Sequence, residues 1–244
     1  MTAQPLANTI ALVTGASRGI GRSTALALAK AGAHVIAAAR TQGGLEDLDD
    51  EIFAATGAHA TLVPLDLADG PGIDTLGGAI HQRFGRLDIL VHAGAMLGGL
   101  SPVSHVDPKQ WETIVAVNLS STHRLIRSFE PLLKAAPKGR AIFVTTGVVA
   151  RPRAFWGPYA ATKAGLEALV RCWADEMEST NVRCAIVDPN SMRTKMRAEA
   201  FPGEDPETLP HPDEIGPLMV ELATADLGLP KENVVFRQWK AARG

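Results

Sequence analysis

Short apolar runs rich in β-branched residues alternate along the chain with longer, alanine-rich segments. The apolar runs predict strands near residues 10–13, 34–39, 60–65, 88–92, 140–146, 182–188 and 233–237. The segments between them predict helices near residues 20–31, 43–56, 72–84, 108–135, 158–179 and 213–224. This alternation is typical of a parallel sheet covered by helices on both faces.

Right-handed crossovers between such strands give an α/β fold in which a parallel sheet is doubly wound. We expect the strand order 3-2-1-4-5-6-7, with a ligand at the carboxyl edge where the order reverses. The chain has 244 residues, 46% of them hydrophobic, and contains no internal repeat or linker. It therefore predicts a single domain over residues 1–244 with one substantial core.

A glycine-rich turn follows the first predicted strand. Residues 14–21 read Thr-Gly-Ala-Ser-Arg-Gly-Ile-Gly, and an alanine-rich helical segment follows. Glycines at these positions allow a sharp turn, the close approach of a pyrophosphate and tight packing of helix on strand, while the helix N-terminus offers free N–H groups. The turn predicts a dinucleotide site; the alternative is a tight turn that binds nothing.

The only tyrosine of the chain, Tyr159, lies four residues before Lys163. Residues at this spacing share one face of a helix, so the ammonium can favour the phenolate and lower the phenol pKa from about 10. The pair predicts a proton donor. The alternative is a solvated surface pair.

Together, the glycine turn and the Tyr159/Lys163 pair resemble the short-chain dehydrogenase/reductase family, essentially from end to end. The resemblance implies a Rossmann-type fold with a nicotinamide cofactor. The residues expected to bind the cofactor are Gly15, Ser17, Arg18, Gly19, Ile20, Gly21, Arg40, Asp66, Leu67, Ala93, Gly94, Tyr159, Lys163, Pro189 and Thr194.

The same resemblance implies hydride transfer between nicotinamide and a small carbonyl or alcohol. Tyr159 would exchange the proton as general acid/base, and Lys163 would lower the Tyr159 pKa and bind the ribose. Asn118 is similar to the family's helix-kinking catalytic Asn and would hold a water. Thr146 stands where the family usually has a catalytic Ser, so a hydroxyl is kept.

Two segments depart from the family pattern. The family's Asn-Asn-Ala-Gly aligns with residues 92–95, His-Ala-Gly-Ala, and its Pro-Gly aligns with Pro189-Asn190. Asn tolerates positive φ better than other non-glycine residues, so the second change is mild. His92 has either a structural role or a contact with substrate. The first departure leaves open an NADP-binding sensor or scaffold of the same fold that no longer turns over.

Charge at the end of the second strand favours NADP(H) over NAD(H). An acidic residue there would bind the 2′-hydroxyl of NAD, but Ala39 occupies that place and Arg40 follows it. Arg40 and Arg18 could converge on a 2′-phosphate. The alternative is that both arginines are solvated.

Composition excludes several classes of protein. With 24 basic and 26 acidic residues and a pI near 6.4, the chain has no basic surface for nucleic acid. No stretch is long and apolar enough to span a bilayer, and the N-terminus does not resemble a signal peptide. Cys172 and Cys184 indicate buried thiols in a reducing cytoplasm, and no ligand spacing indicates a metal site.

The substrate is less well defined by the sequence. A proline-broken segment, about residues 190–212, predicts a mobile lid. The apolar residues that could line a pocket, or could be ordinary core, are Met96, Leu97, Phe155, Trp156, Met192 and Met196. The lid cations Arg193, Lys195 and Arg197 either attract an anionic substrate or are solvated. The family resemblance implies a homodimer or homotetramer built through the two long helices, near residues 108–135 and 158–179.

Overall fold

The computed structural model describes residues 4–225 and 232–243, and over these residues seven parallel strands form one sheet. The strand order is β3-β2-β1-β4-β5-β6-β7, which confirms the predicted order. The strands are β1 (Ile10–Thr14), β2 (His34–Ala39), β3 (Thr61–Pro64), β4 (Ile89–His92), β5 (Gly139–Val144), β6 (Val182–Asp188) and β7 (Val234–Val235).

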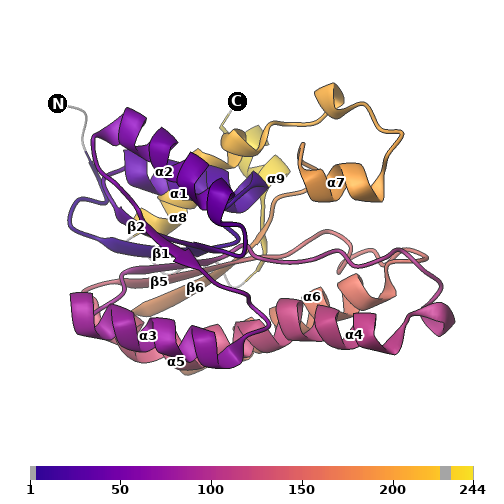
Figure 1. Cartoon of the computed structure of the whole chain (residues 1–244), viewed down its shortest axis with the longest axis horizontal. Coiled ribbons are helices and arrows are strands. Elements are labelled where there is room, and N and C mark those ends of the chain that lie inside the picture. The colour runs from indigo at the N-terminus through magenta and orange to yellow at the C-terminus, as the bar shows by residue number, and fades with distance from the viewer. Residues whose placement is uncertain (1–3, 226–231, 244) are drawn as a thin grey trace.

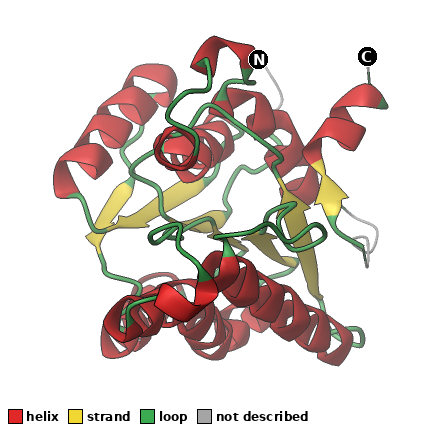
Figure 2. Ribbon diagram, turned by 90° about the vertical axis from the view of Figure 1, so that its right-hand side faces the viewer, coloured by secondary structure: helices red, strands yellow, loops and turns green. Residues whose placement is uncertain are grey.

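Helices cover both faces of this sheet (Figures 1 and 2). On one face lie α1 (Gly19–Lys30), α2 (Gln42–Thr56) and α8 (Gly216–Thr224). On the other lie α3 (Gly70–Phe84), α4 (Pro108–Val115), α5 (Ser121–Ala135) and α6 (Gly157–Glu176). Two short helices, α7 (Lys195–Ala200) and α9 (Phe236–Ala241), follow β6 and β7. This is the doubly wound arrangement predicted from the sequence.

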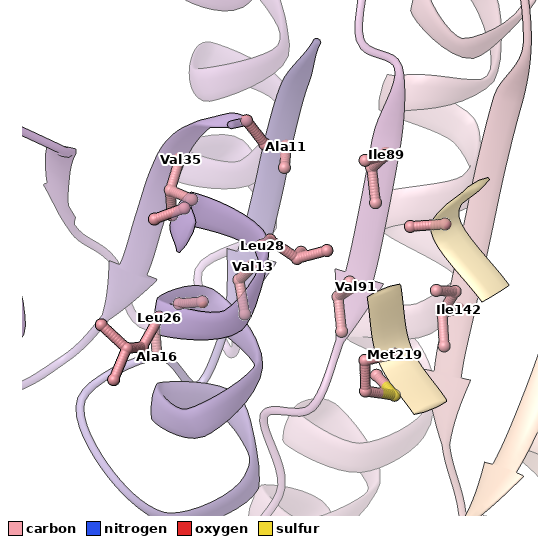
Figure 3. Close-up of a cluster of buried hydrophobic side chains, with 14 of the residues drawn as sticks. Ala11, Val13, Ala16, Leu26, Leu28, Val35, Ile89, Val91, Ile142 and Met219 are labelled. Carbon is pink, nitrogen blue, oxygen red and sulfur yellow. The ribbon is translucent and has the colours of Figure 1, made fainter. Parts of the chain in front are cut away.

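Successive residues of the central strands pack into two separate apolar clusters. In β1, Ala11 and Val13 pack under α1, whereas Leu12 packs on the opposite face. Figure 3 shows the first cluster, where Val91 and Met219 join the β1 residues. Side chains of a strand alternate between the two faces, so a strand buried on both faces reads as an unbroken apolar run.

Two predicted elements are divided differently in the structure. The helix expected over residues 108–135 is α4 and α5, joined by a five-residue π-helical turn, η2 (Ala116–Ser120). The strand expected over residues 233–237 pairs with β6 only at Val234 and Val235. Phe236 then begins α9, because its side chain enters the core under α1 and α8 and the chain must turn there.

The segment over residues 190–212 is folded rather than irregular. Thr194 caps α7, accepting a hydrogen bond from the Arg197 backbone N–H, and a 3-10 turn, η3 (Pro206–Thr208), follows. The two arginines on this segment are fixed by carboxylates, with Arg193 on Glu207 and Arg197 on Glu204. The predicted lid is therefore a short helix and a turn held by ion pairs.

One expectation about the cysteines is wrong. Cys184, on β6, is buried, but Cys172 is exposed on α6, because this helix packs only one side against the sheet. Over the described part of the chain, no helix is both long and apolar enough to cross a membrane.

Candidate active site

A cavity of about 760 Å³ opens at the carboxyl edge of the sheet, where the strand order reverses between β1 and β4. Loops after β1, β2, β3, β4, β5 and β6 all contribute to its wall. Among the predicted site residues, the structure brings together around this cavity Gly15, Ser17, Arg18, Gly19, Ile20, Gly21, Arg40, Asp66, Leu67, Ala93, Gly94, Thr146, Tyr159, Lys163, Pro189 and Thr194. Asn118 is the exception and does not line it.

The glycine turn has no room for a side chain at Gly15 or Gly21. Gly15 has φ +69°, and a Cβ atom on it would lie 2.6 Å from the Gly94 Cα. A Cβ on Gly21 would lie 2.3 Å from the Gly15 carbonyl oxygen. Helix α1 begins at Gly19, after an extended Arg18, and no side chain caps its first N–H groups. These amides face the cavity and form a site for an anion such as phosphate.

Two hydroxyl groups meet at the other end of the cavity. Thr146 follows β5, and Tyr159 lies in the first turn of α6, where Pro158 suits the helix start. The Thr146 side chain is close enough to Tyr159 to lower the pKa of the phenol. Both residues line the cavity, although Tyr159 is only 7% exposed. This places a phenol and an alcohol where one ligand atom could contact both.

The protein's own groups shift the pKa of Tyr159 in the direction opposite to the expected one. Burial, followed by the nearby Asp188 carboxylate, raises the pKa of Tyr159 to about 12, and the Thr146 side chain only partly offsets this. Lys163 is buried and donates from Nζ to the Val144 carbonyl oxygen at 2.8 Å. Burial lowers the Lys163 pKa to about 8, although the negative charge of Glu167 acts to raise it. The expectation of a lowered Tyr159 pKa was wrong because it omitted burial and the charge of Asp188.

Asn118 lies inside the π-helical turn and is fully buried. Its Oδ1 accepts from the Met96 backbone N–H at 2.9 Å, and its Nδ2 donates to the Met96 carbonyl at 2.9 Å and to Thr162 Oγ1 at 3.2 Å. The side chain thus braces the loop after β4 against α6. The water that sequence analysis assigns to Asn118 stays a prediction.

His92 ends β4 and is also fully buried, outside the cavity wall. Its Nδ1 lies 2.8 Å from Thr14 Oγ1, and its Nε2 lies 3.5 Å from Ser121 Oγ. Burial, followed by the charge of Lys163, lowers the His92 pKa to about 3, so the ring is neutral. Of the two interpretations left open by the sequence, this geometry favours the structural one: His92 ties β4 to β1 and α5.

The second departure from the family pattern, Asn190, adopts φ +58°, as expected for a residue in place of glycine. Its side chain also makes a contact that glycine could not. Asn190 Oδ1 accepts a hydrogen bond of 2.8 Å from the Arg237 backbone N–H, in the first turn of α9. The loop after β6 is therefore tied to the C-terminal helix.

Two exposed guanidinium groups lie at the end of the cavity beside β2. In residues 4–225 and 232–243, neither Arg18 nor Arg40 has a salt-bridge partner, and both line the wall. Asp66 lies nearby, with Oδ1 accepting from the Ala68 N–H. Thr41, which follows Arg40, also lines the wall and was missed because no sequence pattern marked it.

The opposite end of the cavity has an apolar wall. Five of the six candidates line it, namely Met96, Leu97, Trp156, Met192 and Met196. The sixth, Phe155, is 53% exposed and does not. Sequence analysis missed Phe201, whose ring lies 5.8 Å from the Trp156 ring, because it follows the end of α7 without periodicity.

The cations at this end differ from those expected. Arg193 and Arg197 are engaged by carboxylates, whereas Lys195 lines the cavity without an ion pair in the described part of the chain. Arg151 and Arg153, in the loop before α6, line it as well and were missed. The residues described include no cluster of three or more His, Cys, Asp or Glu side chains that could hold a metal ion.

Comparison with known proteins agrees with this geometry. The family model for short chain dehydrogenases matches residues 9–205. The chain is 36% identical to the uncharacterized oxidoreductase YciK of Escherichia coli K12, over 89% of this chain and 86% of that protein.

Two solved structures of short-chain dehydrogenases are also similar to this chain in fold and sequence. A short-chain dehydrogenase of Shigella flexneri complexed with NADP superposes with a TM-score of 0.92 at 33% identity, covering 97% of this chain and all of that one. Another, of Escherichia coli CFT073 complexed with NADPH, gives a TM-score of 0.90 at 34% identity and covers 96% and 98% of the two chains. The chain therefore belongs to the short-chain dehydrogenase family and is an oxidoreductase of that family.

Proposed function

We propose that this protein is an NADP(H)-dependent oxidoreductase that transfers a hydride between nicotinamide and a small carbonyl or alcohol. The observation that carries the proposal is that Tyr159 and Thr146 line one cavity together with the glycine turn. A site with a dinucleotide cradle at one end and a proton donor at the other suits this reaction.

The cavity fits the cofactor at both of its ends. The uncapped N–H groups of α1 are donors for a pyrophosphate, and the lack of space for a Cβ on Gly15 or Gly21 keeps the backbone accessible. Arg18 and Arg40 supply positive charge for a 2′-phosphate. The NADP and NADPH bound in the Shigella and Escherichia structures support the same choice.

In the reduction direction the cofactor, when bound, supplies a hydride to the carbonyl carbon. Tyr159 gives its proton to the carbonyl oxygen, and the Thr146 hydroxyl stabilises the developing negative charge on that oxygen by a hydrogen bond. Lys163, held on the Val144 carbonyl, lies one helical turn from Tyr159 and would contact the ribose. Asn118 keeps the loop after β4 in place through both Met96 backbone bonds.

The test is the substitution Tyr159→Phe, which removes only the hydroxyl. We expect NADPH consumption with any accepted ketone or aldehyde to fall by about 10³-fold or more, with NADPH binding still measurable by fluorescence titration. Thr146→Ser, which keeps a hydroxyl, is the matched control and should retain turnover. An active Tyr159→Phe variant would refute the assignment.

The substrate end supports a carbonyl compound with an apolar body. Methionine and aromatic side chains line this end, together with residues of α7. A single domain over residues 1–244, a homo-oligomer formed through the long helices and a cytoplasmic location also stay proposals. The non-catalytic alternative loses its main support, because His92 is satisfied within the fold and leaves the catalytic groups in place.

A further inference from the structure

The end of β6 carries a carboxylate that the reaction mechanism above does not use, and its charge acts on the Tyr159 phenol. Asp188 is the last residue of β6 and is only 8% exposed. The ladder between β5 and β6 ends one residue earlier, at Val144 and Val187. Asp188 therefore projects from the point where these strands separate into the Thr146 loop and the Pro189 loop.

In the described part of the chain, the hydrogen-bond partners of this carboxylate are N–H groups. Oδ1 accepts from the Asn190 backbone N–H at 2.8 Å, and the Asn190 side-chain amide lies 3.4 Å from Oδ2. The Gly147 backbone N–H is a further donor. A carboxylate is acceptor-only, whereas a protonated carboxyl would also need an acceptor for its own hydrogen. The surroundings of Asp188 thus suit the ionised form.

These bonds connect both loops that flank the phenol. Gly147 follows Thr146 and lies against the carboxylate, since a Cβ on Gly147 would be 3.2 Å from Asp188 Oδ2. Asn190 follows Pro189, and all four of these loop residues line the cavity. Asn190 in turn holds the first turn of α9 through Arg237. Asp188 therefore fixes the positions of the two loops and also places negative charge near the Tyr159 hydroxyl.

We propose that Asp188 is a positioning residue for the proton transfer: it joins the loops after β5 and β6 and keeps Tyr159 protonated, as a donor for carbonyl reduction. This inference rests on the proposed function. A negative charge close to a phenol disfavours the phenolate, so reduction, which needs the phenol, is supported to higher pH. Oxidation, which needs the phenolate, is shifted to alkaline conditions by the same charge.

Other charged groups act on the same carboxylate from two helices. Burial is the largest influence and raises the Asp188 pKa above its ordinary value. The charge of Glu167 on α6 also raises this pKa, whereas the backbone hydrogen bonds of Asn190 and Gly147 and the charge of Arg237 on α9 lower it. Glu167 is itself held by the Thr145 hydroxyl at 2.6 Å and by Arg171 at 3.0 Å. Its charge does not replace that of Asp188 at the phenol, since the nearby charge that raises the Tyr159 pKa is that of Asp188.

Because Tyr159 is the only tyrosine of the chain, its ionisation can be measured directly. Protein labelled with carbon-13 at the tyrosine Cζ gives one resonance, which is titrated by NMR while circular dichroism reports the fold at each pH. In Asp188→Asn we expect the resonance to move at a pH lower by about one unit or more. Asp188→Ala is a second neutral variant, should Asp188→Asn fold poorly.

The matched control is Asn190→Gly, which removes a side chain from the same turn but keeps the charge of Asp188 and its backbone donor. We expect its tyrosine titration to follow the wild type. The alkaline limb of kcat/KM for carbonyl reduction should move to lower pH in Asp188→Asn and stay in place in Asn190→Gly. A tyrosine titration identical in wild type and both neutral variants would overturn the proposal, even if these variants were less stable. This readout needs no substrate, so it is separate from the Tyr159→Phe test of the proposed function.

Discussion

The backbone of Gly15 lies directly against the backbone of Gly94, so that a Cβ on Gly15 would sit 2.6 Å from the Gly94 Cα. A Cβ on Gly94 would in turn lie 2.4 Å from Leu67 Cδ1. The turns after β1 and β4 thus touch through their main chains. This explains why position 15 requires a glycine, because a Cβ there would meet main-chain atoms of residue 94, whereas a Cβ at position 94 would be that close only to the end of the Leu67 side chain.

This contact predicts a difference between two glycine substitutions. Gly15→Ala should destabilise the protein by about 2 kcal/mol more than Gly57→Ala. Both positions have positive φ, +69° and +75°, and share that backbone cost, but a Cβ on Gly57 has nothing within 4 Å. Chemical denaturation measures the difference in the free energy of unfolding, and NADPH titration should show a loss only for Gly15→Ala. Equal costs for the two variants would mean that the Gly94 backbone moves away freely.

The sequence was sufficient for the sheet because its strands are buried on both faces. Runs such as Ile10–Val13 are continuous in apolar character and are bounded by turns, so their type and order could be predicted. The glycine turn and the Tyr159/Lys163 spacing identified most of the cavity wall in the same way, since both motifs are local in sequence.

The remaining features depend on contacts that no local pattern encodes. The π-helical turn at Asn118 contains no glycine or proline that would mark a break, so one long helix was predicted. Phe236 has the composition of a strand residue but begins α9, where Asn190 accepts from the next backbone N–H. The effect of Asp188 on Tyr159 could not be predicted, because the two residues are far apart in sequence and come close only in the folded protein, where β5 and β6 end.

Cofactor preference is expected to depend on the guanidinium groups of Arg18 and Arg40. Replacing Arg40 or Arg18 by Ala should weaken NADPH binding by about tenfold or more for each residue, with little change for NADH, because only NADPH carries the 2′-phosphate. The Arg127→Ala variant, on the exposed side of α5, is the matched control. The KM values for both cofactors measure the effect. Parallel losses for NADPH and NADH would show that these arginines act on shared parts of the cofactor.

Because His92 is buried in its neutral form, we expect the free energy of unfolding to fall as the pH drops below about 6.5. The His92 pKa is about 3 in the folded protein and near 6.5 when exposed, so between these values the unfolded chain takes up a proton that the folded protein does not. Stability due to neutral His92 is complete above pH 6.5 and falls toward pH 3, by up to about 1.4 kcal/mol per pH unit.

The variant His92→Asn removes this titration, so its free energy of unfolding should depend less on pH between about 6.5 and 3 than that of the wild type. His81→Gln, which changes an exposed histidine of α3, is the control and should keep the wild-type slope. Urea denaturation at a series of pH values gives all three slopes. Identical slopes for His92→Asn and the wild type would contradict the buried, neutral state of His92.

The aromatic rings of Trp156 and Phe201, close to Tyr159 of α6, should determine the KM for a substrate with an apolar body. The Trp156 ring lies 5.9 Å from Tyr159 and 5.8 Å from Phe201, and the Arg197 guanidinium lies 3.8 Å from the centre of the Phe201 ring. Phe201→Ala should raise KM for an aromatic ketone by about tenfold, since it removes a large apolar surface from the pocket.

With a small aliphatic ketone, which would not reach Phe201, the same variant should keep a kcat near that of the wild type. Phe53→Ala removes an exposed ring of α2 that does not line the cavity, and it should leave both KM values unchanged. If Phe201→Ala changed the two KM values equally, the ring would act by holding the α7 segment in place rather than by contacting the substrate. Because Arg197 is also paired with Glu204, Glu204→Gln separates these effects: it loosens the segment but leaves the ring.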